Sequence, residues 1–273
     1  MQYLVNDIER IRMLTLIHIS DTHFHRKEAD NRLMLDRLTS IQNEEFLSSA
    51  EAYLLVTGDI VDDGHEAQYA NAARALTLFP AQRCLVAPGN HDCGTCGIMH
   101  DPICAQRFDR IIAGPLGYTR PYEPKQPIVR VLTDAKGKQL ITIGINACLE
   151  TLDPLDMSRG EVGQAQIDRL DAILKNPSAA GIPKLVYLHF HPFERGFGVE
   201  LRDSAPFLAC LRGRVDVLCF GHKHESRLWS GPNQYNIPWI VASGALKNDT
   251  GRKYFRITLK DNGTLDVTDS LIL

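Results

Sequence analysis

Five short polar motifs recur along this chain of 273 residues, and each follows an apolar run that is typical of a buried strand. They are Asp21-Thr22-His23, Gly58-Asp59, Gly89-Asn90-His91-Asp92, His189 with His191, and Gly221-His222-Lys223-His224. Together they supply carboxylate, imidazole and amide groups but no thiolate, a set suited to moderately hard divalent or trivalent ions. Asp21 and His23 are two residues apart, so on an extended strand both would point to one face and could hold one ion. The motifs therefore indicate a metal site.

The elements that must position these motifs alternate between apolar runs and longer amphipathic patterns, which indicates strand-helix-strand units. The expected buried strands are Leu14–Ile19, Tyr53–Thr57, Cys84–Ala87, Leu140–Ile145, Lys184–Leu188 and Val215–Phe220. The expected helices are Asn31–Ser48, His65–Phe79 and Gln164–Lys175. After His224, short apolar runs separated by turn residues predict the edge of a second sheet.

The order of the motifs resembles the calcineurin-like metallophosphoesterase superfamily, whose pattern runs D-x-H, G-D, G-N-H-[DE], H, G-H-x-H. The resemblance spans Leu14 to His224, and all five motifs in this order are hard to obtain by chance. It implies an α/β fold, a four-layer αββα sandwich with two facing mixed sheets and a dinuclear metal site at the carboxyl ends of the strands. We expect residues 13–273 to form a single metallophosphoesterase domain. Residues 1–12 are then an N-terminal extension, either an additional turn or the product of a mis-set start codon.

The resemblance also implies how two ions, Mn, Fe or Zn, are bound. One ion is assigned Asp21, His23, Asp59 and His224, and the other Asp59, Asn90, His189 and His222. Asp59 is the expected bridge, because a carboxylate has two oxygens. The alternatives are that Asp21 caps a helix with His23 on the surface, and that the Asn90 motif is a simple turn.

The histidines His189 and His191 are harder to assign, because the family often shows His-His-x-Pro or His-x-Pro where this chain has His-Phe-His-Pro. We predict that His189 is the ligand and that His191 contacts substrate or supports a ligand. His25, in a basic loop with Arg26 and Lys27, could meet a phosphate at the pocket mouth or be part of an exposed charged loop.

Two residues are predicted to be catalytic, His91 and Asp92. The family places the histidine of this motif beside the substrate rather than on a metal. We expect Asp92 to accept a hydrogen bond from one ring nitrogen of His91, which would fix its tautomer and let it donate a proton to the leaving-group oxygen. The nearby Asp62 and Asp63 are expected to support ligands or to belong to the loop.

The function that follows is hydrolysis of a phosphoester by attack of a metal-bridging hydroxide, without a covalent enzyme intermediate. The framing residues His18–His23 and Gly58–Gly64 are similar to those of bacterial class III cyclic nucleotide phosphodiesterases and related glycerophosphodiesterases. We therefore predict a phosphodiesterase of small diesters such as 3′,5′-cyclic nucleotides. A phosphomonoesterase, nucleotidase or pyrophosphohydrolase is the alternative, and a non-catalytic binding module is the third, although its usual sign, a missing ligand or catalytic histidine, is not seen.

The composition of the chain limits the kinds of partner that we expect it to bind. The net charge of −3 gives no long-range attraction to polyanions, which disfavours a nuclease that tracks a duplex, and no stable nucleic acid partner is expected. No apolar run reaches the length of a membrane span, so we predict a cytoplasmic protein with reduced thiols. Whether the tail after Trp229 shapes a homodimer is left open. Cys93, Cys96 and Cys104 could hold a structural zinc, form a redox bridge or be ordinary thiols, and we favour the last.

Overall fold

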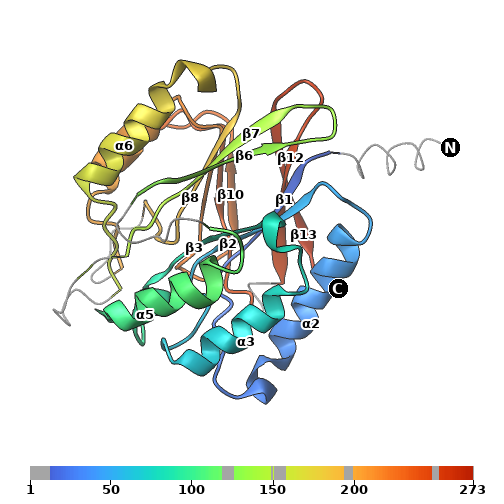
Figure 1. The fold of residues 1–273 in the computed structure, drawn as a ribbon. Coiled ribbons are helices and arrows are strands. Elements are labelled where there is room, and N and C mark those ends of the chain that lie inside the picture. The colour runs from blue at the N-terminus through green and yellow to red at the C-terminus, as the bar shows by residue number, and fades with distance from the viewer. Residues whose placement is uncertain are drawn as a thin grey trace.

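The computed structural model describes residues 13–118, 126–148, 150, 158–193, 199–247 and 252–272. The predicted extension, residues 1–12, lies outside these ranges. Two sheets dominate the structure (Figure 1). The first has the strand order β13-β12-β1-β2-β3, with β1 (Thr15–Ile19), β2 (Ala52–Thr57), β3 (Cys84–Ala87), β12 (Lys253–Leu259) and β13 (Leu265–Leu271). The second has the order β10-β11-β9-β8-β7-β6, with β6 (Ile128–Thr133), β7 (Gln139–Gly144), β8 (Lys184–Tyr187), β9 (Val217–Phe220), β10 (Arg227–Ser230) and β11 (Trp239–Ala242).

The strands that precede the polar motifs run parallel to their neighbours. In the first sheet β1, β2 and β3 are parallel, and in the second β7, β8 and β9 are parallel. Antiparallel strands flank them in both sheets, so both sheets are mixed. Parallel strands end at one edge of their sheet, and this is the edge at which the motifs gather.

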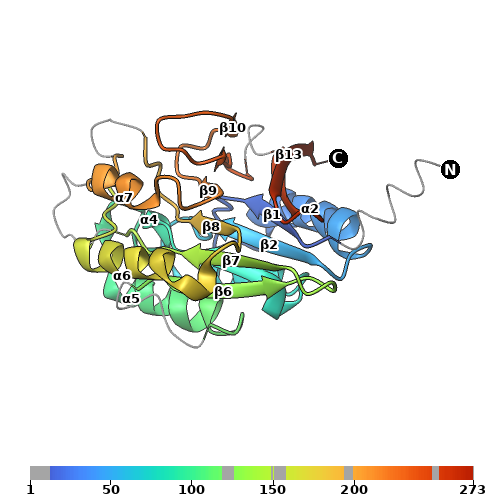
Figure 2. The same cartoon turned by 90° about the horizontal axis from the view of Figure 1, so that it is seen from above.

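Helices cover the outer face of each sheet (Figures 1 and 2). The first sheet is covered by α2 (Arg32–Ile41), which continues into a π-helical segment Gln42–Phe46, by α3 (Glu66–Leu76), and by Phe108–Ala113, the continuation of α5 (Pro102–Arg107). The second is covered by α6 (Gln164–Lys175) and α7 (Ser204–Leu211). Shorter elements are α4 (Asn90–Cys93), the hairpin of β4 (Gly94–Thr95) and β5 (Met99–His100), and the 3₁₀ turns Glu28–Asn31, Ala81–Arg83 and Pro177–Ala179.

The alternation of side chains along the strands explains why there are three apolar layers. In β1, Ile17 packs with the helices of the first sheet, whereas Leu16 packs between the two sheets against residues such as Leu185. A separate cluster lies between the second sheet and its helices and includes Val186. The expectation of a four-layer αββα sandwich is therefore confirmed.

The predicted strands before the motifs and the three predicted helices are present, with ends shifted by a few residues. Strand β6 and helices α5 and α7 were not predicted. The expectation for the tail was only partly right, because it supplies β10 at the edge of the second sheet and β13 at the edge of the first. Among the described residues, no helix has the length and apolarity needed to span a membrane.

Candidate metal centre

All seven predicted ligands lie in the loops that follow β1, β2, β3, β8 and β9 and converge at one place. Two of the groups with metal-binding geometry consist of predicted ligands, one of Asp21, His23 and His224 and the other of Asp59, His189 and His222. Asn90, at the start of α4, joins the second group, since its Oδ1 lies 3.1 Å from Nε2 of His189. The fold thus brings together residues that are up to 203 positions apart, from Asp21 to His224.

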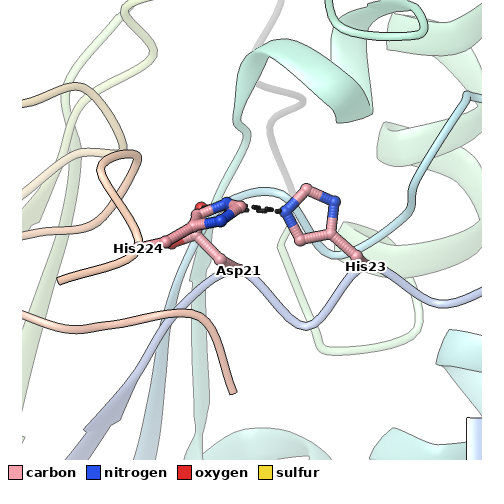
Figure 3. A group of neighbouring side chains, drawn as sticks. All are labelled: Asp21, His23 and His224. Atoms are coloured by element: carbon pink, nitrogen blue, oxygen red, sulfur yellow. Dashed lines mark hydrogen bonds and ion pairs between the residues drawn. The ribbon is translucent and has the colours of Figure 1, made fainter. Parts of the chain in front are cut away.

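The first group is shown in Figure 3. Nε2 of His224 lies 3.2 Å from Oδ1 of Asp21 and 3.1 Å from Nε2 of His23. Asp21 and His23 come from the loop after β1, and His224 reaches them from the loop after β9, so the group joins the two sheets. Asp21 and His23 are buried, whereas the side chain of His224 is 36% exposed, which leaves this side of the group open to solvent.

The second group meets the first at Asp59. Oδ2 of Asp59 lies 3.1 Å from Nε2 of His189 and 3.9 Å from Nε2 of His23, which belongs to the first group. Nδ1 of His222 lies 3.1 Å from the same nitrogen of His189. One carboxylate oxygen therefore stands near the ligand atoms of both groups, as a bridging ligand requires.

The distances between the side chains are also those expected of ligands that share a metal ion. Two nitrogens that bind one ion at about 2.1 Å lie roughly 3.0 to 3.4 Å apart in tetrahedral or octahedral geometry. The nitrogen pairs His23–His224 and His189–His222 are both 3.1 Å apart. Oδ1 of Asp21 is buried without a hydrogen-bond partner among the described residues. The donor set therefore fits two ions that accept mixed nitrogen and oxygen ligands.

Backbone amides hold the carboxylates in place. The amide of His222 donates to Oδ2 of Asp21 at 3.1 Å, and the amide of His91 donates to Oδ1 of Asp59 at 3.0 Å. Each carboxylate thus keeps its other oxygen for the ligand groups. Gly89 and Gly221 make this possible, because a Cβ atom at either position would collide with the carboxylate of Asp59 or Asp21.

The buried carboxylates and histidines of the centre shift one another's pKa values. Burial would raise the pKa of Asp59, but the neighbouring histidines outweigh it and hold that pKa well below its usual range. Burial would lower the pKa of His189, yet the carboxylates of Asp59 and Asp21 raise it to about 10. For His222, burial and the adjacent His189 lower the pKa to about 3. Two buried carboxylates thus attract positive charge to this point, which divalent ions would supply.

The backbone of the centre is unusual. Among the described non-glycine residues, seven have positive φ, and five of them are Asp21, His23, Asp59, His222 and His224. A left-handed backbone is sparsely populated by such residues, and it clusters at functional sites where the surrounding structure enforces it. The turn that it makes beyond each strand end is what aims these side chains at one point.

The expected role of Asp92 is wrong in its geometry. Its carboxylate accepts hydrogen bonds from the amides of Gly89 and Val61, at 2.9 and 3.0 Å, so it ties the loop after β3 to the loop after β2. The ring of His91 is held instead by a main-chain group, because its Nδ1 lies 2.5 Å from the carbonyl oxygen of Asp62. A carbonyl oxygen only accepts, so Nδ1 carries a proton and Nε2 is the ring atom left to face a substrate.

Asp62 contacts more of the centre than the sequence indicated. Its Oδ1 lies 3.3 Å from Nδ1 of His23, whose Nε2 faces the first group, so a carboxylate orients this ligand. The same carboxylate lies 3.4 Å from Nζ of Lys247 and from Nδ1 of His25. The sequence analysis missed Lys247, which follows the last motif and carries no motif of its own. Asp63 instead pairs with Arg26 at 2.7 Å, in the loop.

His25 and His191, the two predicted substrate contacts, lie in different surroundings. His25 is 38% exposed and borders the centre through Asp62, so its proposed role is still open to test. His191 is buried among aromatic rings, with its centroid 4.6 Å from Phe220 and 6.2 Å from Trp229. Among the described residues its ring contacts aromatic side chains rather than the two ligand groups, so its role in contacting substrate or supporting a ligand stays a prediction.

The cysteines after the Asn90 motif do not form a recognisable site. The strand β4 separates Cys93 from Cys96, and an extended chain of that length places their Cα atoms roughly 10 Å apart, too far for a disulfide. Among the described residues, no group of three metal-binding side chains includes a cysteine. Sγ of Cys104 lies 3.5 Å from the carbonyl oxygen of Gly64, which supports the interpretation as ordinary thiols.

Comparisons with known proteins agree with this geometry. The family model for calcineurin-like phosphoesterase matches residues 14–226. No curated protein matches the sequence. A dimetal phosphatase from Danio rerio has a similar fold, with a TM-score of 0.61 and 13% identity over 95% of this chain and 99% of the phosphatase.

Two further solved structures are similar. A putative 5′-nucleotidase from Staphylococcus aureus has a TM-score of 0.60 and 12% identity, and the match covers 96% of this chain but only 54% of the nucleotidase. The phosphopantetheinyl hydrolase of Mycobacterium tuberculosis has a TM-score of 0.54 and 15% identity over 87% of this chain and 92% of the hydrolase. At such identities these likenesses show a common fold.

Proposed function

The chain belongs to the calcineurin-like phosphoesterase family of metal-dependent phosphoester hydrolases, and from this premise we propose that it hydrolyses small phosphodiesters such as 3′,5′-cyclic nucleotides. Asp21, His23, Asp59 and His224 would hold one ion, and Asp59, Asn90, His189 and His222 the other. When bound, two such ions make a water molecule nucleophilic near neutral pH and offset the charge of the phosphoryl oxygens. Mn, Fe and Zn all accept these ligands.

His91 is the residue that we assign to the leaving group. Its Nδ1 is fixed by the carbonyl of Asp62, and its amide is bonded to the bridging Asp59, so the ring is held beside both ligand groups. Protonated at Nε2, it would donate to the leaving-group oxygen as the phosphorus–oxygen bond breaks. An alkyl ester needs this proton because its leaving group would otherwise depart as an alkoxide of high pKa.

The observation that favours a diester is the pairing of three basic side chains in loops that border the centre. The basic side chains Arg26, Arg159 and Lys247 each contact a carboxylate, on Asp63, Glu200 and Asp62 respectively, at 2.7, 2.9 and 3.4 Å. A monoester dianion brings a second negative charge that needs a cation outside the metal centre, whereas a diester carries one. Cations already paired with acids serve the diester better.

The test is hydrolysis by metal-stripped protein reloaded separately with Mn, Fe or Zn. The substrates are bis-p-nitrophenyl phosphate, p-nitrophenyl phosphate and 3′,5′-cyclic nucleotides. We expect metal-dependent turnover with a preference for the diesters. A preference for the monoester would replace this proposal with a phosphatase or nucleotidase, and stoichiometric metal without turnover of any substrate would indicate a binding module.

A further inference from the structure

The hairpin of β4 and β5 stands directly against the residues that we assign to catalysis. Its turn residue Gly97 has φ of +71°, and its carbonyl oxygen accepts a hydrogen bond from Nδ2 of Asn90 at 3.1 Å. A Cβ atom on Gly97 would lie 2.6 Å from that nitrogen and 2.6 Å from Nε2 of His91. The tip of the hairpin is therefore in contact with the one ring atom that faces a leaving group.

The hairpin is also unusually apolar for an exposed segment. Ile98 is 43% exposed and Met99 39% exposed. Polar residues would be expected at such positions in a turn that faces solvent. They line a narrow cleft together with Asn90, His100 and Arg159. The volume enclosed is about 10 Å³, room for a water molecule and no more, so a larger group would lie across the rim against Ile98 and Met99.

Resting on the function proposed above, we propose that this hairpin binds the leaving-group side of the substrate and selects an apolar or aromatic alcohol, such as a nucleoside, over a small polyol such as glycerol. The leaving-group oxygen must lie within hydrogen-bond distance of Nε2 of His91, and Gly97 contacts that atom. The carbon skeleton attached to this oxygen consequently emerges next to Ile98 and Met99. An aromatic or apolar skeleton gains by burial there, whereas the hydroxyls of a polyol would lose water without gaining partners.

The experiment compares the double variant Ile98→Ser/Met99→Ser with a matched control, Val129→Ser/Val131→Ser. The control removes apolar side chains of similar exposure, 42% and 50%, from β6, the outermost strand of the second sheet. Both variants and the native enzyme are assayed with bis-p-nitrophenyl phosphate, a 3′,5′-cyclic nucleotide and the symmetric phosphodiester of two glycerol molecules, whose leaving group is glycerol whichever bond breaks. Metal content and melting temperature are measured alongside.

We expect the hairpin variant to raise KM for the aryl and nucleotide substrates about 10-fold, as loss of apolar pocket contacts does elsewhere, with kcat and metal content little changed. The native preference for these substrates over the glycerol diester should fall by the same factor, and the control should stay within about twofold. An unchanged KM for the aryl diester, or an equal loss on all three substrates, would overturn the proposal.

If the proposed phosphodiesterase function is wrong, the same assays give a different set of results. If the native enzyme cleaves monoesters only, the same variants are compared with p-nitrophenyl phosphate and glycerol 2-phosphate. Selective loss on the aryl monoester would then keep the role of the hairpin while the diester assignment falls. Native protein that cleaves none of these substrates with any ion would overturn both.

Discussion

His189 and His191 are two residues apart after the same strand, yet one lies in the metal centre and the other in an aromatic cluster. Nε2 of His189 lies 3.1 Å from both a carboxylate oxygen and an amide oxygen. The ring of His191 packs against Phe193, Phe220 and Trp229 instead. Their residue type and sequence spacing are those of a ligand pair, so the difference comes from the backbone between them.

The reason is that β8 ends at Tyr187. In a strand, residues two apart share a face, but this rule stops where the strand stops. Asp21 with His23 and His222 with His224 also lie beyond their strands, and these pairs converge because their backbones are left-handed. Neither His189 nor His191 is left-handed, so a spacing of two gives a converging pair only where the turn after the strand is left-handed, and the spacing alone does not reveal this.

The largest effect is expected at the residue shared by both halves of the metal centre. Asp59→Ala should empty or disorder both ion sites and reduce hydrolysis to the background rate, because Asp59 stands near ligand atoms of both groups. Metal analysis after gel filtration gives the ion content, and an assay gives the rate. Asp63→Ala, which removes a loop ion pair with Arg26, is the matched control. A variant that still binds two ions would show that Asp59 is not the bridge.

A large effect on turnover alone is expected at His91. His91→Ala should lower kcat by about 10² to 10⁴ while both ions stay bound, since we propose that its ring acts as an acid rather than as a ligand. The same metal analysis and a kcat measurement test this. If an ion were lost with the ring, His91 would have to be reassigned as a ligand.

An intermediate effect is expected at Asp62, which orients His23. Asp62→Asn should weaken metal binding about 10- to 100-fold, because a carboxylate partner fixes the ring and raises the basicity of a ligating histidine. Competition with a chelating dye measures the affinity, and Asp63→Asn serves as the comparison. Equal affinities in the two variants would mean that the contact between Asp62 and His23 is incidental.

The smallest effect is expected in the aromatic cluster. His191→Phe should leave ion content and kcat/KM within about twofold and lower the free energy of unfolding by about 1 to 3 kcal/mol, since the ring volume is kept but the amide of Phe193 loses its acceptor, Nδ1 of His191. His189→Phe should lose the second ion. Chemical denaturation and metal analysis on the pair provide the contrast, and loss of metal from the His191 variant would return it to the site.

With the family resemblance, the sequence was sufficient for the layers and for the side chains that the fold brings together at the candidate metal centre, for different reasons. Strands such as Cys84–Ala87 are buried on both faces. A strand of this kind must be apolar along its whole length, and a continuous apolar run can be recognised in the sequence. Asp21, His23 and Asp59 were chosen as candidate ligands because polar motifs follow such runs in the order of the calcineurin-like family.

What the sequence could not supply were contacts that depend on the path of the chain. Asp62 uses a main-chain carbonyl to hold His91, and a carbonyl leaves no trace in a sequence. Asp92 was predicted to accept a hydrogen bond from the ring of His91, but its carboxylate accepts hydrogen bonds from backbone amides of two loops instead. The turn at Gly97 lies over Asn90 only because a hairpin of a few residues folds back after α4.

The left-handed backbone at Asp21, His23, Asp59, His222 and His224 implies a trade-off between activity and stability. Each such position costs on the order of 1 to 3 kcal/mol, and glycine would adopt the same conformation without that cost. Replacing any of these residues by glycine would relieve strain and remove a ligand in the same step. Selection for thermal stability alone would thus favour glycine at these positions and the loss of the metal centre. If these five residues are retained in related proteins, selection for activity must have retained them.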